Sequence, residues 1–463
     1  MNVKKSFEKL IKTAKEFLKN SKGKYGEIRI EEYCGSNISI IGKEVEDVKS
    51  SENLGGCCRA LYSNGWGFVS FNDINDTVKY FIEAEEQSKC IRSKKIELAD
   101  APVVKDSDII KTADSPDKYN LSDKFDICAK YSSILKKNKK LQTSSVRYRD
   151  TIKKTLLLTS NGSEIYSETA FCGIACSAMA RDGSNIQSGY FTQGDYQGFK
   201  KNILGLEDRC KIIGERAVRL LSAEPVKPGK YVIIIDPVLC GVFAHEAFGH
   251  LSEADFIYEN PNMKKIMKLG RKFGGDNLNI IDDPTMPNLA GSYKYDSEGV
   301  KSKKTFLIKN GILTGRLHSR ETASKLKEKT TGNSRAISFG FPPIVRMSNT
   351  YIDNGKNTFN EMIESAEYGI YAKGALGGMT NTEMFTFSSE EAFLIENGKI
   401  TKPLRDVILS GNVFETLKNI DMIGDDLKHH GGLGGCGKGG QSPLPVTDGG
   451  PHIRIKDVII GGK

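Results

Sequence analysis

The sequence predicts an α+β fold, with a mixed α/β N-terminal domain over residues 1–222 and a mainly β C-terminal domain over residues 223–463. The 463 residues are enough for two domains with cores of their own. Helix-like and strand-like segments alternate before residue 222, whereas short strand-like runs separated by turn signals dominate after it. Pro225 and Pro228 mark the connection between the two halves.

The first half begins with apolar residues at helical spacing, which predict an amphipathic helix that packs on a core. These residues are Phe7, Leu10, Ile11, Ala14, Phe17 and Leu18. Further helices are predicted over residues 75–88, 122–138 and 206–221. Strands are predicted over residues 25–33, 37–41, 59–70, 141–158 and 171–197, and a long connection over residues 97–117. Asn161-Gly162, between two strand-like runs, predicts a hairpin turn.

The second half opens with an apolar run, Tyr231 to Asp236, which predicts a buried strand, and the helix over residues 237–250 follows it. Asn310-Gly311 and Asn397-Gly398 each follow an apolar run and predict turns between short strands. Residues 351–353 and 406–409 also predict short strands. After residue 250, we expect helices only over residues 319–326, 358–367 and 413–419.

Composition excludes several classes of protein. The net charge of +9, from 67 basic and 58 acidic residues, is mild for this length, and no dense Lys/Arg block carries interleaved aromatics, so we expect no nucleic-acid partner. The longest apolar runs are too short to span a bilayer, and we expect no membrane association. The N-terminal stretch lacks the apolar segment of a secretory signal, so we expect a cytoplasmic protein whose ten cysteines are mostly buried small hydrophobes.

The chemistry is concentrated in His245-Glu246-Ala247-Phe248-Gly249-His250, which holds two of the six histidines of the chain. Imidazole is a preferred ligand of catalytic zinc, and a neighbouring carboxylate can take a proton from water. In the familiar H-E-x-x-H pattern the histidines are four residues apart on one helix face. Here they are five apart, and a regular helix would separate the rings by about 140°. Either the pattern is accidental or the helix is locally unwound; a π-bulge would restore the face, and Gly249 makes such a distortion easier.

Two histidines do not complete a catalytic zinc site, which usually has three protein ligands. The candidate third ligands are Glu253, Asp255, Glu259, His318, His429, His430, His452 and Cys436. Glu253 and Asp255 would need further helix distortion and fit better as partners of the ligands or as helix-end residues. The side chains of the adjacent His429 and His430 diverge, so at most one of them could bind.

Cys436 lies in a glycine-rich segment, residues 431–440, whose backbone can approach a ligand closely, so its thiolate could face a metal. The same segment partly fits the phosphate-loop pattern G-x-x-x-x-G-K-[ST] from Gly432. However, Gly439 replaces the hydroxyl residue, and Pro443 and Pro445 follow where a helix is needed. From the residues alone, a metal site and two merely structural histidines both stay open.

Three segments occur in an order that resembles a known family. They are the His245–His250 motif, Arg346-Met-Ser-Asn-Thr350 and Cys436-Gly-Lys-Gly-Gly-Gln441. Together they resemble the TldD/PmbA family of metalloproteases, over roughly residues 230–456 and more loosely in the first half. One departure is Glu253-Ala254-Asp255, where the family often has Glu-Gly-Asp. Both acidic residues are present, so the difference concerns only the conformational freedom of the backbone at residue 254.

The resemblance implies the roles of four residues. His245, His250 and Cys436 would be the metal ligands, carried in part by a metal-binding helix, and Glu246 would be the general base. One divalent metal per chain is implied, with zinc as the first expectation and iron as the alternative. Because all four residues are present, the chain resembles the catalytic, TldD-like members rather than the TldE/PmbA-type partners.

The resemblance also implies a substrate and an assembly. We expect a metal-dependent peptidase that hydrolyses peptides or unfolded protein segments, and a homodimer or a heterodimer with a paralogue. We expect Arg346, Asn349, Gly377 and Gly378 to line the substrate site. The alternative is a partner-dependent processing factor, or a non-catalytic scaffold subunit, for one specific peptide.

Overall fold

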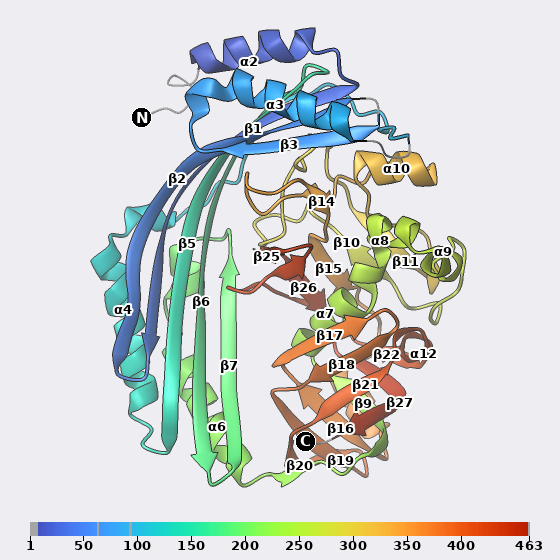
Figure 1. Ribbon diagram of the computed structural model, residues 1–463. Coiled ribbons are helices and arrows are strands. Elements are labelled where there is room, and N and C mark those ends of the chain that lie inside the picture. Colours follow the sequence, from blue (N-terminus) through green and yellow to red (C-terminus); the bar gives the residue numbers. More distant parts are fainter. Residues whose placement is uncertain (1–7, 63, 92–94, 462–463) are drawn as a thin grey trace.

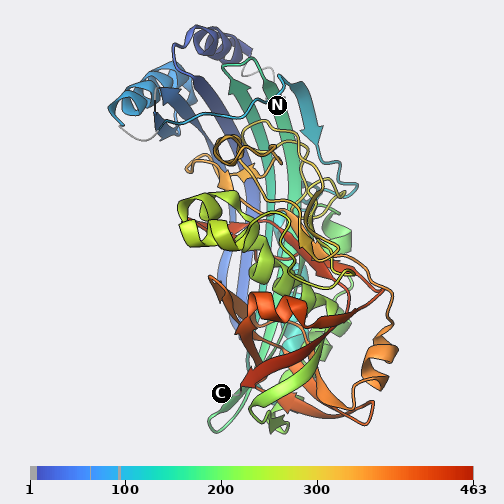
Figure 2. The same cartoon turned by 90° about the vertical axis from the view of Figure 1, so that its right-hand side faces the viewer.

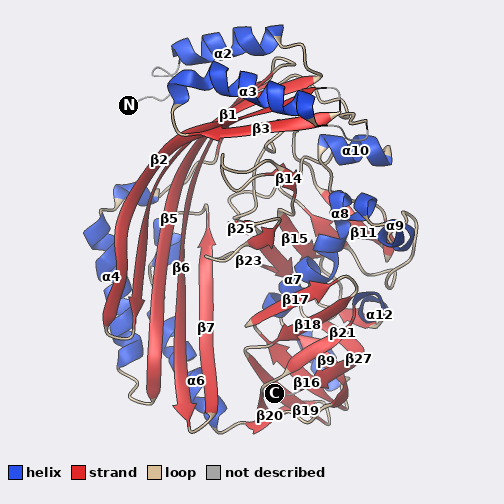
Figure 3. Ribbon diagram, viewed as in Figure 1, coloured by secondary structure: helices blue, strands red, loops and turns tan. Residues whose placement is uncertain are grey.

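The computed structural model describes residues 8–62, 64–91 and 95–461, so Phe7 of the predicted first helix lies outside the described residues. The chain forms an N-terminal half, at the left and top of Figure 1, and a C-terminal half at the right. Figure 3 shows helices and strands in both halves, which confirms the predicted α+β class. Within the described ranges, no helix combines the length and apolar character that a membrane span requires.

The N-terminal half is built on one long, curved sheet. Its strands are β1 (Tyr25–Ile41), β2 (Glu44–Tyr62), β3 (Gly65–Phe71), β4 (Lys105–Ile109), β5 (Leu141–Thr159), β6 (Glu164–Asp182) and β7 (Asn185–Asp195). They are ordered β3-β2-β1-β5-β6, with β4 and β7 pairing different parts of β6. Its helices are α2 (Glu8–Asn20), α3 (Thr77–Cys90), α4 (Leu121–Lys136), α5 (Phe199–Ile203) and α6 (Glu207–Leu221). Short 3₁₀ turns are η1 (Ile74–Asp76) and η2 (Pro116–Lys118).

The two faces of this sheet have different coverings. Because side chains alternate along a strand, Val146 and Tyr148 of β5 pack with Tyr131 of α4 in one core, while the intervening positions point the other way. In Figure 1, α4 and α6 lie on the outer side of the long strands and the C-terminal half lies on the inner side. Figure 2, turned by 90°, shows the C-terminal half in front of the same strands. The polar face of the sheet is thus turned toward the C-terminal half.

The C-terminal half contains two main sheets. The larger one is ordered β17-β18-β21-β27-β9-β16-β19-β20-β8, with β22 on β27, and the smaller one β12-β11-β10-β15-β26-β23. Its first strands are β8 (Glu224–Pro225), β9 (Gly229–Ile235), β10 (Ile280–Asp282), β11 (Thr305–Lys309), β12 (Ile312–Leu313), β13 (Ser334–Arg335), β14 (Ile344–Val345), β15 (Asn349–Ile352), β16 (Tyr368–Lys373) and β17 (Gly377–Asn381). The later strands are β18 (Met384–Ser388), β19 (Glu391–Glu396), β20 (Lys399–Arg405), β21 (Ile408–Asn412), β22 (Ile420–Ile423), β23 (Lys428–His430), β24 (Cys436–Lys438), β25 (Gln441–Leu444), β26 (Thr447–Gly450) and β27 (Ile453–Gly461).

Its helices lie against and between these sheets. They are α7 (Pro237–Ala244), the π turn η3 (His245–Gly249), the 3₁₀ turn η4 (His250–Ser252), α8 (Ala254–Glu259), α9 (Pro261–Ile266), α10 (Arg320–Leu326), α11 (Phe359–Glu364) and α12 (Val413–Lys418). α7 lies within the main core, where Phe243 packs edge-on against Phe385 and Phe387.

Several predicted elements are confirmed and others are wrong. Asn310-Gly311 and Asn397-Gly398 form hairpin turns with positive φ at both residues, as predicted. Residues 25–41 form one strand rather than two, and β4 lies inside the predicted connection. The expectation of only three helices after residue 250 is wrong, because α8 and α9 are also helical. Each has only six residues, too few to show a helical period.

A buried ion network joins the two halves. Arg59 on β2 pairs with Glu27 on β1 at 3.0 Å and with Glu298 of the C-terminal half at 2.9 Å. The Arg59 guanidinium also lies over the Trp66 ring, 4.2 Å from its centroid. All three charged side chains are buried, so each depends on the others for its charge to be compensated.

Arg59→Met should lower the free energy of unfolding by about 3–5 kcal/mol, because it leaves two buried carboxylates without their cation. Urea denaturation of the full chain measures this change. Lys418→Met is the matched control, since it removes an exposed pair with Glu415 whose side chains are 51% and 67% accessible, and it should cost about 0–1 kcal/mol. Equal losses in the two variants would contradict a specific role of the buried network.

Candidate metal centre

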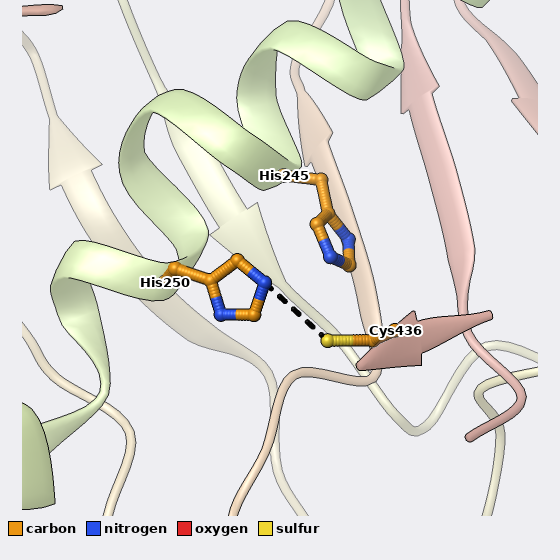
Figure 4. A group of neighbouring side chains, drawn as sticks. All are labelled: His245, His250 and Cys436. Carbon is orange, nitrogen blue, oxygen red and sulfur yellow. Dashed lines mark hydrogen bonds between the residues drawn. The ribbon is translucent and has the colours of Figure 1, made fainter. Parts of the chain in front are cut away.

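The histidine motif sits on a helix that changes its period. Asp236 begins α7 by accepting a hydrogen bond from the backbone N–H of Leu239, and Pro237 occupies the first turn. At His245 the helix widens to a π turn, in which the N–H of His250 donates to the carbonyl of His245. The centroids of the two rings then lie 5.1 Å apart. The π-bulge foreseen from the five-residue spacing is thus present, and both rings face one side of the helix (Figure 4).

Gly249 serves this turn through packing. Its φ of −57° is ordinary for a helix, so the backbone conformation does not require glycine. A Cβ at this position would instead lie 2.1 Å from the sulfur of Met347. The absent side chain therefore lets the segment that carries Met347 pack directly against the π turn.

Cys436 is brought to the same point from a distant part of the chain. It begins the two-stranded hairpin of β24 and β25, where it pairs with Leu444. Its Sγ lies 3.4 Å from His250 Nε2, and the ligand atoms of His245, His250 and Cys436 all lie within 4.8 Å of one another. Ligand atoms around a tetrahedral zinc are about 3.4–3.6 Å apart, given the usual bond lengths. Two imidazoles and one thiolate therefore fit a divalent cation in type and in spacing.

A fully buried arginine holds the hairpin in place. Arg346 Nη2 donates to the carbonyl of Cys436 at 2.6 Å, and its Nη1 donates to the carbonyl of Gln441 at 3.3 Å. The side chain is 0% exposed. Because one planar guanidinium bonds carbonyls at both strands of the hairpin, it fixes the position from which the Cys436 side chain reaches the histidines.

Each histidine is oriented by a carboxylate on its other nitrogen. His245 Nδ1 lies 2.8 Å from Asp448 of β26, and His250 Nδ1 lies 3.0 Å from Glu253. Lys438 of the hairpin in turn contacts Glu253 at 3.1 Å and Asp255 at 2.7 Å. Such partners fix the ring orientation and leave each Nε2 free for a cation.

The charges of the site suit this role. Burial raises the pKa of the Cys436 thiol, but the two imidazoles outweigh it and leave that pKa at about 5, so the thiolate is the stable form at neutral pH. Burial also raises the pKa of the Glu246 carboxyl, while His245 and His250 lower it by less. Glu246 is therefore a stronger base than an exposed glutamate.

The site opens into a cavity of about 640 Å³ between the two halves of the chain. His245 and Glu246 line it from the helix, and Gly377 and Gly378 line it from β17. Its other walls come from β7 and α6 of the N-terminal half and from the glycine-rich segment before Cys436. Both glycines therefore line the cavity into which the site opens, and their contact with substrate stays a prediction.

Arg346 and Asn349, the other two residues expected to line the substrate site, are both 0% exposed. Asn349 Nδ2 donates to the carbonyl of Asp283 at 2.8 Å and to Ser292 Oγ at 3.1 Å. The neighbouring Ser348 and Thr350 bond the buried Asp282. In this structure the Arg346–Thr350 segment thus supports the site from inside the core.

The other candidate ligands lie elsewhere or serve as partners. His318 bonds Glu328, His452 bonds Asp426, and His429 packs on the ring of Tyr351. Glu259 is exposed on α8, whereas Glu253 and Asp255 act as partners of His250 and Lys438. His430 lines the cavity without entering the three-residue group.

The nucleotide-loop alternative finds no support. Lys438 is held by the carboxylates of Glu253 and Asp255, and residues 436–444 form a hairpin with no helix after it.

One residue that contacts the candidate site, Asp448, was missed by sequence reasoning. Asp448 lies 203 residues from His245 along the chain, and no spacing relates the two. The small strand pair that places it, β15 with β26, is parallel and therefore long-range.

Comparisons with known proteins match nearly the whole chain. Residues 26–92, 114–223 and 228–462 match domain 1, the central domain and the C-terminal domain of the PmbA/TldA metallopeptidases. The chain is 42% identical over 437 residues to the metalloprotease slr0863 of Synechocystis, with 94% of each chain covered. It is 28% identical to the zinc metalloprotease TldD homolog of Saccharolobus solfataricus, covering 95% of this chain and 96% of that protein. The structure of TldE from Thermococcus kodakarensis shares the fold, with a TM-score of 0.76, 17% identity, and 98% and 100% of the two chains covered.

Asp448→Ala should weaken binding of a divalent metal by about 10–100-fold, because the His245 ring loses the partner that orients it. Titration of metal-free protein with zinc measures the affinity. Asp426→Ala is the matched control: it removes a carboxylate 2.7 Å from His452, a histidine outside the site. An Asp448→Ala protein that binds zinc as tightly as the control would rule out the orienting role.

Proposed function

The chain belongs to the TldD/PmbA family of metallopeptidases, and we propose that it is a catalytic member that hydrolyses peptides or unfolded protein segments. The observation that carries this proposal is the convergence of His245, His250 and Cys436, with Glu246 beside them, at the wall of a large cavity. A purely structural metal site needs no base. The presence of Glu246 on the cavity wall therefore favours catalysis over a scaffold role.

The residues divide the chemistry between them. A divalent metal bound by His245, His250 and Cys436 would lower the pKa of a coordinated water and polarise the scissile carbonyl. Glu246 accepts the proton of the attacking water on a carboxylate oxygen and later transfers it to the leaving amine nitrogen. Asp448 and Glu253 hold the two imidazoles in position throughout.

Zinc is the metal we propose, at one ion per chain, with iron as the alternative. Imidazole and thiolate donors suit zinc, and one relative is named a zinc metalloprotease. A thiolate donates more charge than a neutral imidazole, so the bound metal would be a weaker Lewis acid than in a three-histidine site. Slow turnover, or activity on selected peptides only, is the expected consequence.

The substrate is proposed to bind as an added strand. β17 ends the order of the larger sheet, and its residues Gly377 and Gly378 line the cavity beside Glu246. Among the described residues, no strand pairs with its outer edge. An extended peptide can use such an edge through main-chain hydrogen bonds, whereas most strands of a folded protein are already paired in its own sheets. This arrangement supports peptides or unfolded segments as substrates.

We further propose a dimer, either of two copies or with a paralogue, in the cytoplasm. Residues 44–54 of β2 form a sheet edge that no other strand covers in the described part of the chain. Val45, Val48 and Leu54 are exposed there, and such an edge is suited to pairing with a second chain. All ten cysteines are free, which suits a reducing compartment. We also propose that the chain has two structural domains, 1–222 and 223–463. The boundary lies before β8 because β8 already pairs with β20 of the C-terminal half.

Glu246→Gln should retain the metal and lose peptide cleavage by a factor of at least about 100, because the carboxylate proposed to take the proton of the water is removed. Cys436→Ser should lose both metal and cleavage. Metal content and cleavage of unstructured peptides are measured on the same purified samples. Cys240→Ala is the control and should keep the metal, because Cys240 is a buried cysteine of α7 that lies outside the proposed ligand set.

Retained hydrolysis in Glu246→Gln would refute the base assignment, and unchanged metal content in Cys436→Ser would refute the ligand assignment. A metal-loaded wild-type chain that cleaves only when a paralogous chain is added would favour the partner-dependent processing factor.

Binding of an uncleaved peptide to Glu246→Gln should slow amide hydrogen exchange in β17, because those amides acquire new partners. Hydrogen exchange read by mass spectrometry measures this. β3 is the internal control, since it also ends a sheet but lies in the N-terminal half. Protection in β3 and not in β17 would move the substrate away from the proposed edge.

A further inference from the structure

A second cavity, of about 380 Å³, lies on the polar face of the N-terminal sheet. Its floor is formed by β1, β5 and β6, and its other wall by segments of the C-terminal half that include residues 292–297 and 443–445. The Cys436 hairpin and the segment before it lie between the two cavities: Gly431, Gly432, Gly434 and Gly435 line the metal cavity, while Pro443, Leu444 and Pro445 line the second one. The volume lies within the range of roughly 300–1,000 Å³ usual for small-molecule sites.

Four cationic side chains line this cavity: Arg29, Arg149, Lys153 and Arg335. The Arg29 side chain is 2% exposed, and its Nη1 has no hydrogen-bond partner among the described residues. Arg149 donates to the carbonyl of Leu433 at 3.2 Å, and Arg335 to the carbonyls of Met347 and Pro445 at 2.6 and 2.9 Å. In the described part of the chain, neither Arg149 nor Arg335 pairs with a carboxylate. Positive charge therefore remains uncompensated here.

The carboxylates of the cavity are already occupied. Glu31 pairs with Arg29 and Lys153, each at 3.1 Å. Asp296 accepts three backbone N–H groups, from Glu298, Val300 and Ser334. Asp108 accepts the backbone N–H of Lys294 at 2.7 Å. The groups left to bind a ligand are hydrogen-bond donors. The ligand must therefore bring a negatively charged group that accepts hydrogen bonds.

The remaining lining suits a peptide. Aromatic rings supply apolar surface; they include Phe171, Tyr196 and Tyr293. Hydroxyl groups on β5 and β6, those of Thr151, Thr155, Ser167 and Thr169, supply partners for peptide groups. Apolar walls with a few converging polar groups are the usual make-up of a ligand site.

We propose that the second cavity binds the C-terminal end of a short peptide, with its carboxylate at the guanidinium groups of Arg29, Arg149 and Arg335. The terminal side chain lies against the aromatic rings. Because Arg149 and Arg335 also hold carbonyls on either side of Cys436, the bound carboxylate sits directly behind the metal-site hairpin. This site needs no metal and no cleavage, so it stands apart from the proposed peptidase activity.

The test is calorimetric titration of the full chain carrying Glu246→Gln, which prevents cleavage of the probe. N-acetyl-Ala-Phe with a free carboxylate should bind, and its C-terminal amide should bind at least about tenfold more weakly, since charge-assisted hydrogen bonds are lost. 3-Phenylpropionate, which has the carboxylate and ring without peptide groups, should bind more weakly than the dipeptide. Equal binding of acid and amide overturns the carboxylate site, and equal binding of 3-phenylpropionate overturns the peptide assignment.

Arg149→Met locates the site and should weaken binding of the acid about tenfold or more. Arg147 lies on the same strand and face as Arg149 but lines neither cavity, so Arg147→Met is the matched control. Arg209→Met is a second control, which removes a guanidinium from the metal cavity. Both controls should leave the affinity unchanged. Loss in Arg209→Met with no change in Arg149→Met would place the peptide in the metal cavity and overturn the proposal. If Arg149→Met does not fold, Arg335→Met is expected to give the same loss, because Arg335 is the second guanidinium without a carboxylate partner at the proposed site.

Discussion

A single five-residue turn of helix determines the geometry on which the rest of the site depends. The N–H of His250 reaches back to the carbonyl of His245, so the two rings face one side where a regular helix would point them about 140° apart. A π turn is uncommon, and the surrounding core must stabilise it. Met347 packs into the space left by Gly249 on one side, and Phe248 packs edge-on against Phe273 on another. The distortion is therefore held by the packing of the whole C-terminal half.

The position of Cys436, the third proposed ligand, depends on a buried cation that has no buried anion as its partner. Arg346 has no ion-pair partner among the described residues, and its two terminal nitrogens donate to the carbonyls of Cys436 and Gln441. Burying a guanidinium is costly unless its donors are satisfied, so this arrangement is stable only while the hairpin stays in place. The segment around Arg346 is thus better understood as the support of the metal site than as a surface for substrate.

The sequence predicted those features that depend on local spacing. The five-residue interval between His245 and His250 brings the rings to one face only if the helix is locally unwound, as in a π turn, and the Asn-Gly turns carry their own conformational signal. Features that depend on long-range pairing could not be predicted in this way. Asp448 reaches His245 only because β26 joins β15, and β4 is a strand only because β6 lies beside it. Likewise, nothing in the residue type of Arg346 indicates whether it faces solvent or a carbonyl.

The electrostatics of the hairpin favour a cation over a phosphate at a segment that partly fits a phosphate-binding loop. Lys438 lies against Glu253 and Asp255, so its charge is used inside the protein. With Lys438 neutralised there, the groups that face the metal position are the Cys436 thiolate and, on the cavity wall, Glu246. A divalent cation displaces the protons of the two imidazoles and is attracted by the thiolate and the carboxylate, whereas a phosphate meets these two negative groups at short range. The side of the hairpin that faces the second cavity has the opposite character, because there the uncompensated charges are guanidinium groups. One glycine-rich wall thus separates a position suited to a cation from a position suited to a carboxylate.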